Sequence, residues 1–156
     1  MSDDGPSNNF TNPIIGRWRY RSFLPEPNDV PFANLEFGDA VLRFTPGPMQ
    51  SISGQIGGPL GGGQNWQLLL QGSMTYSNPF TLRFEGKGLV NGEQWIYDYE
   101  AYLTRPWPNG VGQVPAITGS VIRMIPHSDG NGGMAPAGYA APFTAIWIDA
   151  KYDAAV

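Results

Sequence analysis

The chain has 156 residues, no cysteine and a formal net charge of −4 at pH 7. This length is typical of one domain that can enclose a core, and the lack of cysteine excludes disulfides, thiolate metal sites and a cysteine nucleophile. The net charge is negative and the sequence contains no basic run. This argues against nucleic acid or an anionic membrane surface as a partner, because both require clustered Lys and Arg.

Residues 1–12 are acidic and polar and contain no apolar segment of a secretory signal. They are predicted to form a flexible arm before a single domain over residues 13–156, and we expect a cytoplasmic protein. Short β-rich runs then alternate with turn residues, and Asn91-Gly92 is the strongest hairpin signal. The glycine-rich residues 57–63 are predicted to form a hairpin tip. The predicted strands cover residues 14–23, 35–45, 51–56, 66–76, 80–90, 95–103, 117–125 and 143–152.

Eight consecutive strands with short connections predict an all-β fold, an eight-stranded antiparallel up-and-down β-barrel, because closure removes unpaired strand edges. A β-sandwich is the alternative. Eight strands enclose an interior that is filled by side chains or holds one small ligand. Glycines within the strand runs favour closure, since Gly weakens a strand unless a bend or a close approach requires it. These glycines are Gly16, Gly54, Gly72, Gly86, Gly88 and Gly119.

The strand pattern resembles the calycins, which include the lipocalin and avidin families. Gly16-Arg17-Trp18 is similar to the Gly-x-Trp that opens the first calycin strand. Residues 52–56 and 70–74 and the final apolar strand fall where avidin-like barrels have comparable strands. In lipocalins a late arginine packs over the first-strand tryptophan, and Arg123 is similar in placement. The resemblance covers about residues 14–150 and implies a barrel with a ligand site in its lumen.

Alternation along the strands predicts which side chains face the interior, except in the second and last strands, where it is ambiguous. In the first strand the aromatic face lies opposite a face of arginines, which belong in solvent. In the sixth it lies opposite Asp98 and Glu100, so a solvated carboxylate pair is favoured over a pair for acid–base chemistry. Buried phenols and indoles need polar partners, which favours a ligand site over a filled core. The residues expected to bind the ligand are Trp18, Tyr20, Trp66, Trp95, Tyr97, Tyr99 and Arg123.

His127 is the only histidine, and histidine is the residue type whose charge changes near neutral pH. It follows the seventh predicted strand, where barrel mouths carry functional loops, and the alternative is an exposed loop histidine. Together with Tyr97 and Tyr99 it is a candidate for proton transfer. One histidine, no cysteine and no clustered carboxylates predict no metal site, and we expect no cofactor.

These observations favour a barrel that binds a small apolar or aromatic molecule in its lumen. One alternative is a cyclase or isomerase of specialised metabolism that uses the cavity as its active site, and another is a structural or assembly protein with a filled core. A cavity of roughly a few hundred Å³ would argue against the filled core. Convergence of tyrosine hydroxyls and His127 in that cavity would favour the enzyme. Apolar side chains on the expected outer faces, at Leu69, Ile146 and Ile148, predict a homodimer or higher homo-oligomer.

Overall fold

The computed structural model describes residues 13–26, 29–31, 34–61, 63–77, 79–104 and 111–152, so the predicted arm lies outside the described residues. Its strands are β1 (Gly16–Phe23), β2 (Glu36–Phe44), β3 (Ser51–Gly61), β4 (Gln64–Thr75), β5 (Phe80–Val90), β6 (Glu93–Thr104), β7 (Ala116–Arg123), β8 (His127–Ser128), β9 (Met134–Ala135) and β10 (Ala140–Asp149).

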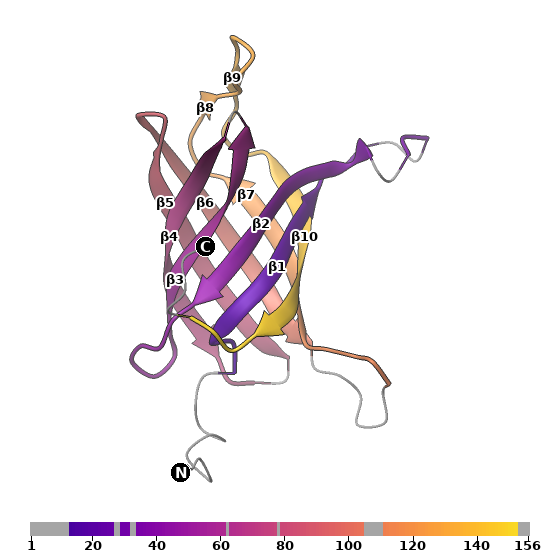
Figure 1. Ribbon diagram of the computed structural model, residues 1–156, viewed down its shortest axis with the longest axis vertical. Coiled ribbons are helices and arrows are strands. Elements are labelled where there is room, and N and C mark those ends of the chain that lie inside the picture. The colour runs from indigo at the N-terminus through magenta and orange to yellow at the C-terminus, as the bar shows by residue number, and fades with distance from the viewer. Residues whose placement is uncertain are drawn as a thin grey trace.

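Eight of these strands form a closed antiparallel barrel in the order β1-β10-β7-β6-β5-β4-β3-β2, and β8 pairs with β9 in a separate hairpin (Figure 1). Among these eight strands, neighbours around the wall follow one another in the chain, apart from the contact of β1 with β10 that closes the barrel. The predicted up-and-down barrel is therefore confirmed, and the sandwich alternative is wrong. No helix in the described part of the chain is long and apolar enough to cross a membrane.

Two connections differ from the prediction. The third strand was expected to end at residue 56, but β3 continues to Gly61, and Pro59 pairs with Asn65 of β4. Ladder pairing uses backbone groups, so the glycine-rich segment extends the hairpin although it has few side chains to pack. The connection that follows β7 contains the β8–β9 hairpin, which lies beyond the rim at the end of the barrel opposite the start of β1 (Figure 1).

Trp18 packs in the core at the end where β1 begins. Trp18 has no exposed surface, and its Nε1 donates a hydrogen bond of 2.8 Å to the carbonyl oxygen of Ile14. The ring of Trp147 from β10 meets Trp18 edge-on, with ring centroids 5.2 Å apart. Trp18 therefore faces inward as predicted and belongs to the packed core of this end.

Close contacts between strands explain two of the glycines. A Cβ atom on Gly72 would overlap the carbonyl oxygen of Arg83 on β5, and a Cβ atom on Gly119 would overlap the carbonyl oxygen of Glu100 on β6. Neither neighbouring atom is at the end of a flexible side chain, so both positions exclude larger residues. These approaches are of the kind that a small, strongly coiled barrel requires.

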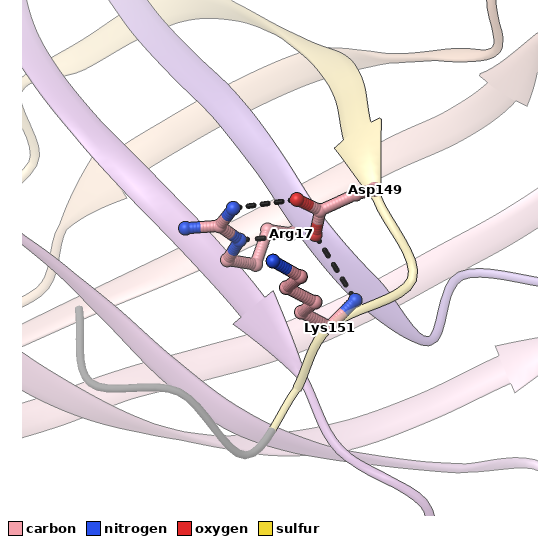
Figure 2. A network of polar contacts seen from close by, with 3 residues as sticks. All are labelled: Arg17, Asp149 and Lys151. Carbon is pink, nitrogen blue, oxygen red and sulfur yellow. Dashed lines mark hydrogen bonds and ion pairs between the residues drawn. The ribbon is translucent and has the colours of Figure 1, made fainter.

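The arginines of β1 face outward and pair with carboxylates on neighbouring strands. Arg17 donates from Nε and Nη2 to the two oxygens of Asp149, at 3.0 and 2.5 Å, and the backbone N–H of Lys151 donates to Oδ1 of the same carboxylate (Figure 2). Arg19 pairs with Asp39 at 2.8 Å, and Arg21 lies 3.9 Å from Glu36. These pairs link β1 to both of its neighbours on the outer wall.

Leu69 does not share a surface patch with Ile146 and Ile148. Leu69 lies on β4, whereas Ile146 and Ile148 lie on β10, and three strands separate β4 from β10 in either direction around the barrel. The two groups are therefore on opposite walls. The predicted homo-oligomer would therefore use one of these walls, or each wall in a separate interface.

Candidate functional site

A cavity of about 790 Å³ opens at the end of the barrel that carries the β8–β9 hairpin. Its wall is made of strand ends, namely the last residues of β1, β3, β5 and β7 and the first residues of β2, β4 and β6. Apolar and polar side chains both line this cavity. They include Tyr20, Ser22, Trp66, Leu68, Val90, Glu93, Trp95, Tyr97, Tyr99, Val121, Arg123 and His127.

Most of the residues predicted to bind a ligand are brought together here. Trp18 is the exception, because it lies in the core at the opposite end and does not line the cavity. Alternation along a strand fixes the face of a side chain, but its height along the barrel axis depends on register and strand tilt. The lining residues among those predicted are Tyr20, Trp66, Trp95, Tyr97, Tyr99, Arg123 and His127.

Three polar side chains form a chain of hydrogen bonds at one side of the cavity. The hydroxyl of Tyr97 lies 2.7 Å from Nε2 of His127, and Nε of Arg123 donates to the Tyr97 hydroxyl at 3.2 Å. Nδ1 of His127 lies 2.9 Å from the carbonyl oxygen of Ser128. A carbonyl only accepts hydrogen bonds, so Nδ1 carries the proton, and Nε2 of the neutral ring accepts from Tyr97.

Residues of β6 hold both the ring of His127 and the short strand that carries it. His127 is 5% exposed in β8, and the ring of Trp95 stacks on it with centroids 4.1 Å apart and planes at 15°. The carboxylate of Glu93 accepts the backbone N–H of Ser128, with N–O distances of 3.1 and 3.0 Å. The alternative of an exposed loop histidine is therefore wrong, because the hairpin folds His127 into the cavity.

Arg123 is buried at the end of β7, with 5% of its surface exposed. Its Nη1 donates to the carbonyl oxygen of Pro136 at 3.1 Å, and its Cζ lies over the rings of Phe37, Tyr97 and Tyr139 at 5.5–5.7 Å. The placement implied by the lipocalin resemblance is wrong, because Arg123 packs on these rings and Trp18 packs at the other end of the barrel.

Sequence reasoning did not identify three residues of this arrangement. Phe37 lies in the second strand, where alternation was ambiguous, and Tyr139 lies in the connection to β10. Glu93 follows the Asn91-Gly92 turn, which shows that β6 starts there but not that its carboxylate reaches Ser128. Only contacts distant in sequence reveal their roles.

Three tyrosine hydroxyls at the cavity differ in what acts on their pKa. Burial raises the pKa of Tyr20 and raises the pKa of Tyr99 well above its usual value, so both stay protonated near neutrality. Burial also raises the pKa of Tyr97, while the hydrogen bond and the charge of Arg123 act in the opposite direction. Among these three phenols, Tyr97 is the one that contacts both a cation and an imidazole.

A second hollow, of about 980 Å³, lies on the outer wall of β5, β6 and β7. Asp98 and Glu100 line it, and Glu100 accepts a hydrogen bond of 2.7 Å from Arg83. Glu100 is exposed and Asp98 half-buried, so the carboxylates are on the outward face, as the alternation predicted. Within the described residues, no three His, Asp or Glu side chains are placed to hold a metal ion.

Comparisons of the chain with protein-family models, with curated proteins and with solved structures found no match.

Proposed function

We propose that the protein binds a small molecule with an apolar or aromatic body in the cavity beneath the β8–β9 hairpin. The observation that carries this proposal is the cavity itself, whose volume of about 790 Å³ is in the usual range for ligand pockets. Trp66, Leu68 and Trp95 offer an apolar wall to such a ligand, and Arg123 and Tyr97 offer polar contacts. A space of this size at one end argues against a barrel whose interior is filled along its whole length.

The general form of the barrel also supports a calycin-like protein. Gly16-Arg17-Trp18 opens β1, and the barrel has eight antiparallel strands that follow chain order. We propose this relationship on these features and on the position of the cavity at one end of the barrel.

Two adjacent positions on β5 provide a test of the cavity. Val90 is buried and lines the cavity, whereas Leu89 is 69% exposed and points outward. We expect Val90→Trp to fill part of the cavity and weaken binding of the uncharged dye N-phenyl-1-naphthylamine by about tenfold or more, measured by the fluorescence of the dye. Leu89→Trp adds the same side chain outside and should leave the affinity unchanged. If both variants bind the dye as the unsubstituted protein does, the cavity is not the binding site.

Catalysis of a proton transfer is a second candidate function, and the hydrogen bond between Tyr97 and His127 favours it. A substrate oxygen that replaced His127 as acceptor of the Tyr97 hydroxyl would leave Nε2 free to accept a proton from a carbon atom. Return of that proton to another carbon would complete an isomerisation, with Tyr97 stabilising the negative charge on oxygen between the two steps.

Deuterium incorporation tests this candidate. Small molecules that co-purify with the protein are extracted and incubated with it in D₂O, and their masses are followed with time. We expect a carbon-bound deuterium to appear with the unsubstituted protein and to disappear with His127→Gln. Retention of ligand without any exchange would leave binding as the function.

A further inference from the structure

We propose that the ligand of this cavity is an organic monoanion, with its charged group bound by Arg123 and its apolar or aromatic body against Trp66 and Trp95. The proposal rests on the function proposed above and adds the chemical class of the ligand. It follows from a buried positive charge that has no carboxylate partner.

Most arginines in the described residues pair with a carboxylate on the outer wall, and Arg43 and Arg123 are the two that do not. Arg43 lies on the outward face of β2 and donates to the side-chain oxygen of Gln55 on β3. Arg123 lies on the inner wall, is 5% exposed and lines the cavity. Nε of Arg43 is buried without a hydrogen-bond partner, but Arg43 does not line the cavity. A buried charge is costly unless it is paired, and Arg123 is the one of the two that a ligand in the cavity can reach.

The two carboxylates that line the cavity with Arg123 already accept other hydrogen bonds. Glu93 and Asp129 both line the cavity, yet neither forms an ion pair with Arg123. Glu93 accepts the N–H of Ser128, and Oδ1 of Asp129 accepts the backbone N–H groups of Asn131 and Gly133. The phenol of Tyr97 adds no negative charge, because burial raises its pKa.

The guanidinium retains the capacity to bind an anion. It has five N–H donors, and the described residues accept hydrogen bonds from two of its nitrogens, Nε and Nη1. The rings of Phe37, Tyr97 and Tyr139 hold its plane, and stacking leaves the N–H edges free to donate. A planar carboxylate or a sulfonate matches this fork, and the hydrogen bonds would be strengthened by charge. Glu93 and Asp129 would repel a dianion, which favours a single negative charge.

A matched pair of dyes tests the inference. The dye 8-anilinonaphthalene-1-sulfonate has the ring skeleton of N-phenyl-1-naphthylamine and differs from it by one sulfonate group. We expect the protein to bind the anionic dye at least about tenfold more tightly than the neutral dye, in fluorescence titrations at the same ionic strength. Val90→Trp should weaken binding of both dyes, which places them in the same cavity.

Substitutions of two arginines then show which residue causes the preference for the anionic dye. Arg123→Met should abolish the preference for the anionic dye, because it should weaken binding of the anionic dye by at least about tenfold more than binding of the neutral dye, while Arg123→Lys should retain part of the preference. Arg43→Met removes the same charge from the outer wall and should leave the affinities for both dyes unchanged. This control shows whether the preference comes from contact with Arg123 or from the net charge of the protein.

The outcomes distinguish the two proposals. If the unsubstituted protein binds the neutral dye as tightly as the anionic dye, or more tightly, the proposal of a monoanionic ligand is wrong and the proposed binding function stands. If neither dye binds with saturation, the binding function fails and the inference fails with it. The comparison of the two dyes on the unsubstituted protein tests the charge of the ligand even if Arg123→Met does not fold. If Arg43→Met reduces the preference for the anionic dye as much as Arg123→Met does, Arg123 is not the residue that binds the charged group.

Discussion

The hydroxyl of Tyr97 lies 2.7 Å from Nε2 of His127, although the two residues are 30 positions apart in the chain. The contact joins an inward side chain of the barrel wall to a hairpin outside the wall, and Arg123 donates to the same hydroxyl. The arrangement holds the only histidine of the chain in one tautomer, with the proton on Nδ1 and with Nε2 directed at the hydroxyl of Tyr97.

Nuclear magnetic resonance can observe this tautomer directly, because a single histidine gives an unambiguous signal. We expect long-range ¹⁵N–¹H spectra above neutral pH to show a protonated Nδ1 and an unprotonated Nε2. Tyr97→Phe removes the donor to Nε2 and should shift the ring towards the other tautomer. A ring protonated mainly on Nε2 in the unsubstituted protein would contradict the network.

Loss of the Tyr97 hydroxyl should also lower the free energy of unfolding. Tyr97→Phe leaves Nε2 of His127 and Nε of Arg123 without this partner, and we expect a cost of about 1–3 kcal/mol in urea unfolding. Tyr102→Phe removes a hydroxyl from the same strand on the exposed outer face and should change stability by less than about 0.5 kcal/mol. Equal effects of the two substitutions would argue against a structural role for the network.

The two tryptophans Trp18 and Trp66 should separate stability from binding. Trp18 is fully buried, so Trp18→Ala should cost about 3–5 kcal/mol in denaturant unfolding. Trp66 is half-buried at the cavity, so Trp66→Ala should cost less and should weaken dye binding instead. Folded Trp18→Phe is expected to bind the dyes normally. A loss below about 1 kcal/mol for Trp18→Ala would place Trp18 outside the core.

The ion pair of Arg17 and Asp149 should make stability depend on acid pH. The hydrogen bond from Arg17 lowers the pKa of Asp149 from 3.8 to about 2, so the folded state favours the ionised carboxylate. The resulting contribution is fully present above the unfolded pKa and is lost as the pH falls through about 2. The urea midpoints of the unsubstituted protein and Asp149→Asn should therefore differ most above about pH 4 and converge towards pH 2. A constant difference across this range would exclude the linkage.

Self-association remains a prediction, and the structure indicates which wall to test. Leu69 is flanked on its neighbouring strands by Gln55 and Lys87, whereas Ile146 and Ile148 lie on the same face of β10. We expect light scattering at micromolar concentration to give a mass above the 17.0 kDa of one chain. Ile146→Lys should then produce monomers, and Leu69→Lys should not. A monomer of the unsubstituted protein would contradict the prediction.

The strands and their faces could be predicted because both depend on local sequence. In β5, residues from Phe80 to Glu85 alternate between apolar and polar side chains, and the structure buries Leu82 and Phe84 while it exposes Arg83. The Asn91-Gly92 turn fixes where β5 ends and β6 begins. Such signals repeat every two residues and require no knowledge of distant contacts.

The candidate site could be predicted only in part, because its geometry depends on contacts between distant segments. Trp18 and Tyr20 share a face of β1, yet one is in the closed core and the other lines the cavity. His127 lies in a turn-rich segment whose short hairpin is stabilised by Glu93 and Trp95 from β6. The environment of Arg123 likewise combines rings from β2, β6 and the connection before β10.

A crystal structure of the protein with 8-anilinonaphthalene-1-sulfonate tests the central claim most directly. We expect density for the dye in the cavity, with the sulfonate within hydrogen-bonding distance of Arg123 and the rings against Trp66 and Trp95. Density confined to the outer hollow beside Arg83 and Glu100, with the cavity free of dye, would contradict the account.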